Sequence, residues 1–412
     1  MSTEQVDQPK SPETSLLFER HVIWVLLALL LVAIWYRFVP LIIVDTFLIF
    51  LSIIIMAWKN MSLKRIEPAL QLSKSRLFPG DEFLIHASVY NGKWLPLVWL
   101  EWSFPPNIGI SFGDEKDDTC AIRFLWLLWF QRVKWTLNAK ALQRGVYNIG
   151  QVTLHSGDGF RFAEIEQLHS LDGKLYVYPQ LVPVHVPGFR PSMQWGVRGK
   201  QGGFIEDPLL VIGTREYQPG DELRRLNWRA SARTGKLQAN VYQPLLTEQL
   251  LIYIDVQGFV INETADAFER FLSVIASVSV KYREKGISIG FASNGLNYGG
   301  EKMPFILPGT NLTPLLDQLA QITQQVRIDK MAALNEMLHQ EQLHIPLFFF
   351  SHHIDENHYL WYQQYKHKLS EICFYYKNET EYVNKLAAKA KPMDTFLSPL
   401  ASSSGGHNHG AS

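Results

Sequence analysis

The chain has few cysteines and no net charge, and each absence excludes a class of protein. Cys120 and Cys373 are the only cysteines among 412 residues. They lie in different predicted domains, so the sequence indicates neither a disulfide framework nor a cysteine-based zinc cluster. Basic and acidic residues number 39 each, which removes the long-range attraction typical of nucleic-acid binders. We therefore expect no nucleic-acid partner and several domains, because a single core seldom organises so long a chain.

Two long apolar runs near the N-terminus predict a membrane anchor. They extend from Val22 to Trp35 and from Leu41 to Trp58. The first run has about 14 residues, too short for a hydrocarbon layer of about 30 Å, so we expect it to extend into its flanks. We predict a transmembrane hairpin over 16–60, with spans at about 18–38 and 41–58. A signal peptide is the alternative, but a second span follows directly and no small-residue cleavage site separates the runs.

Basic residues flank the hairpin on both outer sides, and this predicts its orientation. Only Arg37 lies in the turn between the two runs. The basic residues on the outer flanks are Lys10, Arg20, Lys59, Lys64 and Arg65. Because basic loops stay in the cytoplasm, we expect a two-span protein of the cell membrane with both termini and the soluble body cytoplasmic.

Asp45 is the one acid within the second run. It is either a functional intramembrane acid or a residue at shallow depth near the start of the helix, where the helix dipole favours a carboxylate. We prefer the second interpretation, because Pro40 places the start of the helix only five residues earlier.

Residues 61–183 predict an antiparallel β-sandwich of about seven strands. Short segments rich in aromatic and β-branched residues alternate here with turn signals such as Asn91-Gly92. The run Leu-Trp-Leu-Leu-Trp-Phe from Leu125 has two interpretations: an exposed edge for docking or membrane contact, or a strand buried on both faces. We prefer the buried strand, because continuous apolar runs are usually buried.

Residues 251–391 predict a doubly wound, largely parallel α/β domain. Apolar strands such as Leu250–Val256 and Ile345–Ser351 alternate with helical segments, which include 263–282, 311–326, 330–340 and 356–369. An N-terminal arm, 1–15, and a C-terminal tail, 392–412, are expected to be disordered.

The segment 184–250, between these two parts, carries a recognisable signature. It contains Arg-x-Tyr, Pro-Gly-Asp, Arg, Trp and Ser-Ala-Arg in that order. The residues at these positions are Arg215, Tyr217, Pro219, Gly220, Asp221, Arg224 or Arg225, Trp228, Ser231, Ala232 and Arg233. This stretch resembles the signature of the domain-of-unknown-function 58 family. The resemblance extends to the flanks, where Arg144-Gly145-x-Tyr147 is similar to a strand that precedes the signature in that family.

The resemblance implies an α/β domain similar to the von Willebrand factor type A domain, whose metal site uses an Asp-x-Ser-x-Ser loop. Here the loop has Asp255, but Gln257 and Phe259 replace the two hydroxyl residues. Mg²⁺ requires oxygen ligands in near-octahedral geometry. We therefore expect a degenerate metal site at Asp255 and Gln257 and no cofactor, with Mg²⁺ as the less favoured alternative.

The signature also allows a local structural prediction. Pro219-Gly220 suits a tight turn, and Asp221 is placed to cap a helix from Glu222 to about Gly235. Six basic and three acidic residues between 213 and 237 leave a local excess of three positive charges. The arginines either brace the segment against the α/β domain, with Trp228 as a packing anchor, or form a docking surface for an acidic partner. The sequence does not decide between these two roles.

Two other segments contain residues typical of sites. Ala230–Leu237 ends in Gly-Lys as a P-loop does, but Ala230 replaces the leading glycine and Leu237 the Ser or Thr that holds Mg²⁺. The segment after the strand at 345 has metal-ligand side chains, but their spacing matches no zinc motif, and we interpret it as a solvated loop. Those side chains are His352, His353, Asp355, Glu356 and His358.

These observations predict a membrane-anchored, non-enzymatic scaffold or adaptor. Members of the family that this chain resembles are commonly linked to MoxR-type AAA+ ATPases, which implies such an ATPase as the partner in assembly or maturation of envelope proteins. The alternative is a metal-dependent ligand-binding or hydrolytic protein centred on Asp255.

Overall fold

The computed structural model describes most of the chain, in two compact units, 1–180 and 181–412. The described residues are 20–106, 108–113, 121–158, 164–187, 206–219, 221–244, 248–259, 265–326, 331–339, 345–369 and 371–397. The predicted N-terminal arm, 1–15, lies outside these ranges, as do Gly220 and residues 398–412.

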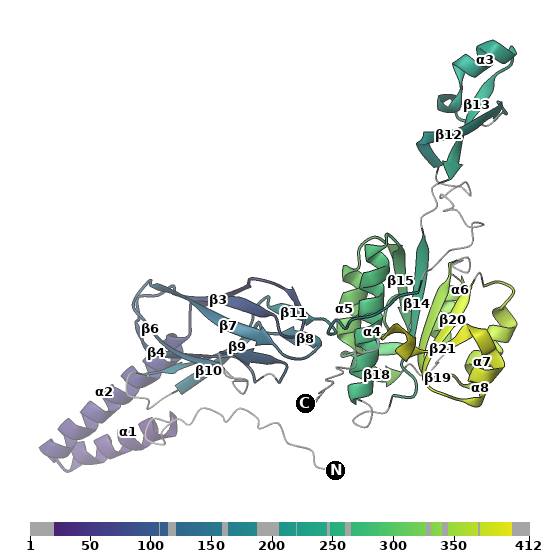
Figure 1. Cartoon of the computed structure of the whole chain (residues 1–412). Coiled ribbons are helices and arrows are strands. Elements are labelled where there is room, and N and C mark those ends of the chain that lie inside the picture. The colour runs from purple at the N-terminus through teal and green to yellow at the C-terminus, as the bar shows by residue number, and fades with distance from the viewer. Residues whose placement is uncertain are drawn as a thin grey trace, which may run out of the picture. The chain divides into compact units, whose positions relative to one another are not determined.

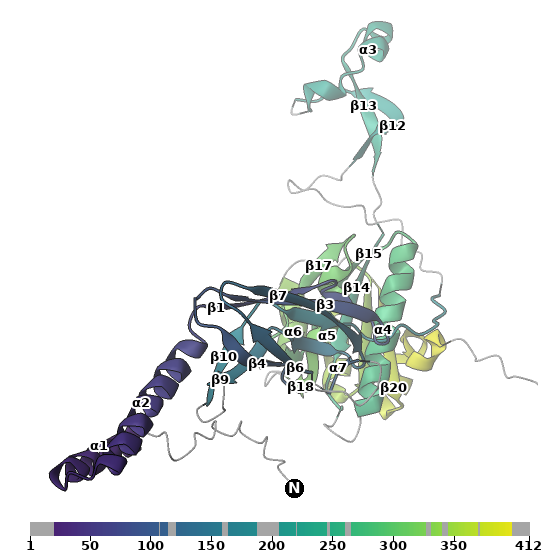
Figure 2. The ribbon, with the colours of Figure 1, turned by 90° about the vertical axis from the view of Figure 1, so that its left-hand side faces the viewer.

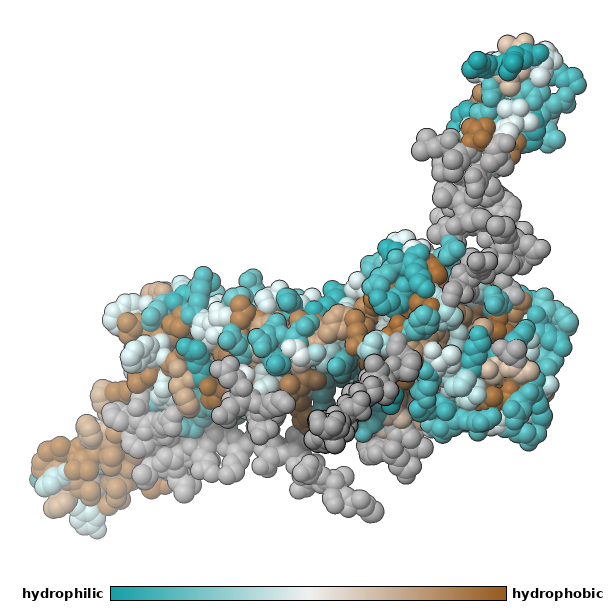
Figure 3. All heavy atoms as spheres, viewed as in Figure 1, coloured by the Kyte–Doolittle hydropathy of each residue, from teal (hydrophilic) through white to brown (hydrophobic). Residues whose placement is uncertain are grey.

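The first unit begins with two apolar helices, α1 (Arg20–Trp35) and α2 (Val39–Ser62). They run side by side, as Figures 1 and 2 show, and their surface is largely hydrophobic (Figure 3). At about 1.5 Å per residue, the 24 residues of α2 cover about 36 Å, enough to cross a bilayer. Among the described helices, α2 is the one long and apolar enough to span a membrane, and α1 is shorter.

Asp45 lies within this helix pair. Its side chain is 1% exposed, and neither carboxylate oxygen has a hydrogen-bond partner among the described residues. The carboxyl group is therefore buried between helices, in addition to lying near the start of α2 as we expected from the sequence.

Two four-stranded antiparallel sheets follow the helices, with strand orders β1-β3-β7-β5 and β10-β9-β4-β6. A third sheet, β2-β11-β8, contains one parallel pair, β2 with β11. The strands are β1 (Ile66–Leu72), β2 (Arg76–Leu77), β3 (Glu82–Asn91), β4 (Leu97–Ser103), β5 (Ile110–Phe112), β6 (Ile122–Leu127), β7 (Arg132–Ala141), β8 (Gly145–Asn148), β9 (Gln151–Gly157), β10 (Glu164–Ser170) and β11 (Lys174–Val177).

One hydrophobic core joins the first two sheets. In β3, buried and exposed side chains alternate along the strand, as expected when one sheet face is covered. Ile85 of β3, Trp102 of β4, Trp135 of β7 and Leu154 of β9 belong to the same cluster. The rings of Trp102 and Trp135 meet edge to face, with centroids 5.1 Å apart. The two antiparallel sheets therefore bury their facing sides against each other.

The aromatic run from Leu125 is not buried on both faces, so the interpretation that we preferred from the sequence is wrong. Strand β6 lies at the edge of its sheet, and Leu127 is its one buried residue. Trp126 is 76% exposed, and Phe124 is also exposed. An edge strand has one neighbour only, so its apolar composition does not ensure that it is covered.

The second unit contains a six-stranded sheet of order β17-β15-β14-β19-β20-β21, parallel except for the antiparallel edge strand β17. The elements of this α/β part are β14 (Gln249–Asp255), α4 (Ala265–Glu284), β15 (Ser288–Ser293), β16 (Gly295–Asn297), β17 (Ile306–Gly309), α5 (Thr313–Gln321), β18 (Ile322–Val326), α6 (Ala332–His339), β19 (Leu347–His353), α7 (Glu356–Tyr365), β20 (Ile372–Asn378), α8 (Glu381–Leu386), η4 (Ala387–Lys389), β21 (Ala390–Pro392) and η5 (Met393–Phe396).

Helices cover both faces of this sheet. On one face, Phe271 of α4 contacts Phe350 of β19, with ring centroids 6.2 Å apart. On the other face, Tyr362 of α7 contacts Phe374 of β20 at 5.8 Å. The predicted parallel α/β sheet is thus confirmed.

Two sequence predictions in this unit need correction. The helix expected over 311–326 ends at Gln321, and Ile322–Val326 forms β18, which pairs with β16. The tail expected to be disordered from 392 is ordered to 397, because Met393 and Phe396 of η5 are buried. Phe396 contacts the ring of Tyr375, with centroids 4.5 Å apart, and the backbone N–H of His185 donates to its carbonyl oxygen at 2.7 Å.

Candidate functional site

The signature residues form a two-stranded antiparallel hairpin. Its strands are β12 (Glu206–Glu216) and β13 (Gln238–Pro244), and the connection contains η2 (Leu223–Arg225) and α3 (Trp228–Thr234). Hydrogen bonds close the base of this connection: the N–H of Tyr217 donates to the carbonyl of Leu237, and the N–H of Asn227 to that of Gln238. We call Tyr217–Leu237 the signature connection.

Asp221 holds the first half of the signature connection together. Both terminal nitrogens of Arg215 donate to its carboxylate, at 2.7 and 2.6 Å, and the N–H of Gln218 donates to it at 2.9 Å. The hydrogen bonds from Arg215 and from Gln218 lower the pKa of this carboxyl group below its ordinary value. The Tyr217 hydroxyl donates to the Asp221 carbonyl at 2.8 Å. The turn at Pro219 is therefore fixed by a bidentate ion pair.

Asp221 does not cap a helix, which corrects the expectation of one helix from Glu222 to Gly235. The connection instead forms the short turn η2 and then α3, whose N-cap is Asn227: its side-chain oxygen accepts from the N–H of Ala230 at 2.9 Å. The helix ends as expected at Gly235, in the left-handed conformation that glycine adopts readily. The extended backbone at Leu226, the C-cap of η2, ends this turn and separates it from α3.

The outer surface of the signature connection is exposed and carries both apolar and basic side chains. Neither η2 nor α3 has a buried residue. Leu223 is 74% exposed and Trp228 70%. Arg229 and Arg233, one helical turn apart on α3, are exposed, and neither has an ion-pair partner within the described ranges.

The two arginines of η2 differ in their surroundings. Arg224 is highly exposed and donates to Glu222 at 2.5 Å. Arg225 is less exposed and lies over the ring of Tyr242, 5.9 Å from its centroid. Arg225 therefore belongs to the internal packing of the hairpin, whereas Arg224 lies at its surface.

A second group of polar residues lies where the parallel strands of the α/β sheet end. Asp255, the last residue of β14, is fully buried. Its Oδ1 atom accepts hydrogen bonds from the Gln257 N–H at 2.9 Å and from Asn294 Nδ2 at 2.5 Å. Its Oδ2 atom lies 2.9 Å from Ser351 Oγ and 3.3 Å from His358 Nε2. Each carboxylate oxygen is thus surrounded by protein donors.

His358 connects Asp255 to a second carboxylate. Its Nδ1 atom lies 2.8 Å from Asp355 Oδ1, and the Asp355 side chain caps α7 by accepting from the His358 N–H. Burial alone would raise the pKa of Asp355, but the hydrogen bond and charge of His358 lower it to about 2. Gln257 Nε2 also donates to Asp355, at 3.2 Å.

From the sequence we interpreted the segment 352–358 as a solvated loop. The structure corrects this, because His358 is buried. His358 is 3% exposed, and its ring contacts that of Phe349, with centroids 5.0 Å apart. His352 and His353 belong to the end of β19 and are half-buried, and Glu356 is exposed at the start of α7. The sequence contained the residue types but no signal that pairs His358 with Asp255, 103 positions earlier.

The residues around Asp255 do not suit Mg²⁺. The ion needs oxygen ligands that are free to bind it, whereas Asn294, Ser351, His358 and a backbone N–H already contact both oxygens of Asp255. Phe259, where type A sites have a hydroxyl, packs against Phe268 and Phe271. Within the described ranges, no group of three or more His, Cys, Asp or Glu is arranged to hold a metal ion.

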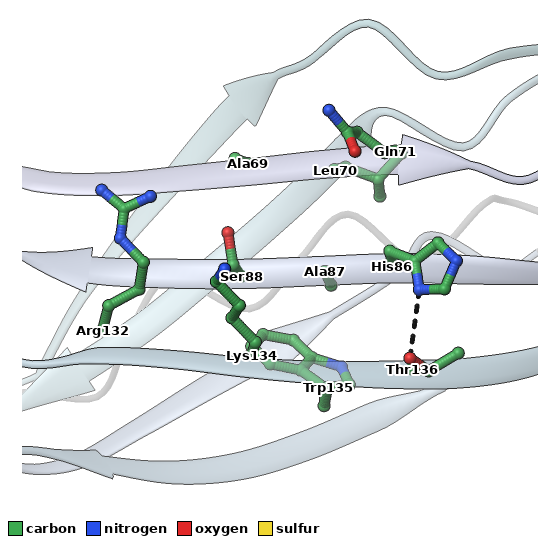
Figure 4. Close-up of a pocket in the computed structure, with 10 residues that line it drawn as sticks. All are labelled: Ala69, Leu70, Gln71, His86, Ala87, Ser88, Arg132, Lys134, Trp135 and Thr136. Atoms are coloured by element: carbon green, nitrogen blue, oxygen red, sulfur yellow. Dashed lines mark hydrogen bonds between the residues drawn. The ribbon is translucent and has the colours of Figure 1, made fainter.

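A hollow of about 550 Å³ lies on the sheet β1-β3-β7, and sequence reasoning did not find it. Figure 4 shows that its side chains come from three neighbouring strands. His86 Nδ1 and Thr136 Oγ1, on the paired strands β3 and β7, lie 3.1 Å apart in its lining. Its basic residues, Arg132 and Lys134, lie on exposed positions of β7. The only sequence signal was the alternation of polar residues along these strands.

Gly286 to Gly290 has the order Gly-x-Ser-x-Gly of a nucleophile elbow, with Ser288 at its centre. Ser288 is buried at the start of β15, and its N–H donates to the Glu248 carbonyl at 2.8 Å. A nucleophile elbow needs an exposed serine between a strand and a helix. This motif is therefore part of the sheet and not an active site.

Comparison with known proteins confirms the resemblance that the signature predicted. Residues 213–363 match the family described as "Protein of unknown function DUF58". The uncharacterized protein YeaD of Bacillus subtilis (strain 168) is 25% identical over 236 residues. The matched part covers 57% of this chain and 57% of that relative, so the chain spans little more than half of the relative's length.

Two solved structures are also similar to parts of the chain. The CARDB domain of a Pyrococcus furiosus protein, in complex with di-metal ions, is 9% identical with a TM-score of 0.20, over 28% of this chain and 96% of that one. The sporulation control protein Spo0M of Bacillus subtilis is 13% identical with a TM-score of 0.16, over 28% and 50%. TM-scores this low support no argument about fold or function.

Proposed function

We propose that this chain, whose residues 213–363 match the DUF58 family, is a membrane-anchored, non-enzymatic adaptor that docks a protein partner through its signature connection. The observation that carries the proposal is the exposure of Trp228 and Leu223 on a connection braced by its own ion pairs. A purely structural role for Trp228 would require a covered ring, whereas 70% of this residue is exposed. Of the two roles considered from the sequence, these observations favour docking.

The chemistry of the exposed side chains suits a protein interface. Tryptophan and arginine are the residues that most often contribute a large share of binding energy, because both bury a large area and retain a polar group. Arg229 and Arg233 add positive charge beside Trp228 on the same short helix. The segment 213–237 has six basic and three acidic residues, so the partner surface that complements it is acidic and has an apolar pocket.

The bracing of the connection also favours binding. Arg215 pairs with Asp221, Lys236 pairs with Glu216 at 2.7 Å, and Asn227 donates to Asn240 at 2.7 Å. A surface that is ordered before it binds loses less conformational entropy on association. These ion pairs and hydrogen bonds thus support the exposed side chains of Leu223 and Trp228.

We further infer that the helices hold this adaptor in the cell membrane as a two-span hairpin. The length of α2 suits a span, and the sequence that contains α1 reaches about 20 residues, also enough for a span, when it is counted from Leu16 to Trp35. The basic residues that flank the pair keep both termini and the soluble body in the cytoplasm. In this account the antiparallel sheets form a β-sandwich and the parallel sheet a von Willebrand factor type A-like domain.

The proposed partner is a MoxR-type AAA+ ATPase, acting in assembly or maturation of envelope proteins. This proposal rests on the family resemblance and on the basic, apolar surface described above. The test uses the full-length chain in lipid nanodiscs and a purified MoxR-type ATPase from the same host, with the dissociation constant measured by biolayer interferometry.

Two variants probe the docking surface: Trp228→Ser, and Arg229→Glu combined with Arg233→Glu. Loss of a residue that dominates an interface costs about 2 kcal/mol or more, which weakens binding about 30-fold. The matched control combines Lys281→Glu with Lys385→Glu, two exposed lysines outside the connection, for the same change in net charge. Absence of binding by the unaltered chain at low salt, or equal weakening in the control, would overturn the proposal.

The alternative function, a metal-dependent binder or hydrolase centred on Asp255, has less support. The oxygens of Asp255 already have protein donors, and Gln257 is turned to Asp355. Calorimetric titration of the chain with Mg²⁺, Mn²⁺ and Zn²⁺ separates the two functions. The adaptor account expects no heat of binding at Asp255, so a saturable signal abolished by Asp255→Asn would favour the alternative.

A further inference from the structure

A cluster of exposed aromatic residues lies at one end of the antiparallel sheets. It combines the turn between β3 and β4 with the end of β6 and the turn that follows it. Trp94 is 78% exposed, and the rings of Trp94 and Trp129 stack with centroids 6.4 Å apart. We call this cluster the aromatic end; its exposed members are Trp94, Trp126, Leu128, Trp129 and Phe130.

The aromatic end is attached to the point where α2 ends. The Nζ atom of Lys93, next to Trp94, donates to the carbonyl of Ser62 at 2.5 Å and to that of Lys64 at 3.0 Å. Ser62 is the last residue of α2. The N–H of Phe130 in turn donates to the Lys93 carbonyl at 3.3 Å. The exposed aromatic rings therefore lie beside the C-terminal end of the apolar helix.

A buried hydrogen-bond network fixes the two turns of the aromatic end to each other. The side-chain nitrogen of Asn91 donates to the carbonyls of Leu95 and Leu128, at 3.0 and 2.9 Å. Lys93 is buried, and this burial lowers the pKa of its ammonium group to about 8. The turns are thus ordered, although their apolar side chains face outward.

Exposed apolar clusters on an ordered surface need an occupant, because water does not solvate them favourably. Tryptophan has an apolar ring and one N–H donor, and this combination favours the headgroup region of a bilayer. Basic residues, which pair with lipid phosphates, accompany the rings at the end of α2: Lys59, Lys64 and Arg65. Attachment to the helix end and charge complementarity both identify the occupant as the lipid surface.

We propose that the aromatic end lies in the interfacial layer of the same bilayer that α2 crosses, as a second membrane contact of this chain. The inference rests on the proposed membrane anchoring. If the end of α2 were the only attachment, the sheets could rotate about it. A second contact through the aromatic end fixes their orientation relative to the membrane. Phe124 and Ile122, exposed further along β6, extend the apolar surface away from the helix end.

The test places one fluorescent label at a time on the full-length chain, after Cys120→Ser and Cys373→Ala. The labelled sites are Trp126→Cys in the aromatic end, Ile53→Cys on the exposed side of α2, and Leu84→Cys on the other sheet. Leu84 lies seven residues from Asn91 along β3, about 23 Å further from the helix end at about 3.3 Å per residue. Nanodiscs of phosphatidylcholine and phosphatidylglycerol carry lipids with a spin label at a shallow acyl position.

The inference expects the spin-labelled lipids to quench the fluorescence of the label at Trp126→Cys. This quenching should be roughly twofold or more stronger than at Leu84→Cys, because the interfacial layer contains the quencher. Quenching at Ile53→Cys but not at Trp126→Cys would overturn the inference alone. Absence of quenching at Ile53→Cys would overturn the membrane span, and this inference with it. Protection of the Trp126→Cys label from aqueous iodide without quenching by lipid would identify a protein as the occupant, which also contradicts the inference.

Discussion

Replacing His358 by leucine should destabilise the α/β part of the chain strongly. The imidazole is buried between two carboxylates, 3.3 Å from Asp255 Oδ2 and 2.8 Å from Asp355 Oδ1. Leucine fills a similar volume but offers no donor to either carboxylate. Asp255, fully buried, then keeps Asn294, Ser351 and one backbone N–H as donors, but loses the group that faces its charge at Oδ2.

The expected magnitude follows from the burial of this pair. Leaving a buried polar group without its hydrogen-bond donor typically costs about 1–3 kcal/mol, and more when the group is charged, as a carboxylate is. For a unit of this size, each kcal/mol lowers Tm by about 2–4 °C, so a loss of about 3 kcal/mol lowers Tm by roughly 6–12 °C. Combining His358→Leu with Asp255→Asn should recover part of this loss, since the neutral amide carries no charge to compensate.

The assay is hydrogen exchange measured by mass spectrometry on peptides that contain β14 and α7, because local opening free energies can be read there without unfolding the membrane part. His367→Leu is the matched control, since His367 is exposed just beyond α7. Protection that falls no further in His358→Leu than in His367→Leu would refute the reasoning. A double variant as unstable as the sum of the two single variants would show that Asp255 and His358 do not interact.

Two further predictions concern single polar residues. The folded-state pKa of Asp355 is about 2, below its ordinary 3.8, so its contribution to stability is complete above about pH 4 and is lost as the pH falls towards 2. The difference in denaturant stability between the unaltered chain and Asp355→Asn should therefore shrink over that interval, and a constant difference would contradict the assignment. Asn227→Ala removes the N-cap of α3 and the hydrogen bond to Asn240, which should cost about 1 kcal/mol of local stability and speed hydrogen exchange in 228–234; Asn227→Ser should retain most of the cap. Equal exchange in the alanine and serine variants would mean that the cap does not hold this helix.

Local patterns made much of the fold predictable from the sequence. The alternation of apolar strands with helical segments after residue 250 identified the parallel α/β sheet, and the order of residues from Arg215 to Arg233 identified the family. The β-branched residues Ile322, Thr323 and Val326 favoured a strand where we expected a helix, and β18 forms there. The predicted boundary of this helix was wrong because a helical segment and a strand follow each other without a turn signal between them.

Long-range pairings were not predictable in this way. Asp255 was recognised at the end of its strand, but Asn294, Ser351 and His358 reach it from other elements, far away in the sequence. We predicted a buried strand at Leu125 from its apolar composition. Composition does not show whether a strand lies at the edge of its sheet, and β6 does. We also predicted Asp221 as the helix cap and overlooked Asn227, which is the N-cap of α3.

The most direct test of the adaptor account is crosslinking mass spectrometry on membranes from the native host, with an amine-reactive reagent. Lys236 and Lys302 are exposed and lie in the signature connection and in the α/β part. The account predicts crosslinks from Lys236 to a cytoplasmic AAA+ ATPase, reduced in the Trp228→Ser variant. Crosslinks only to exported proteins would contradict both the proposed partner and the proposed orientation.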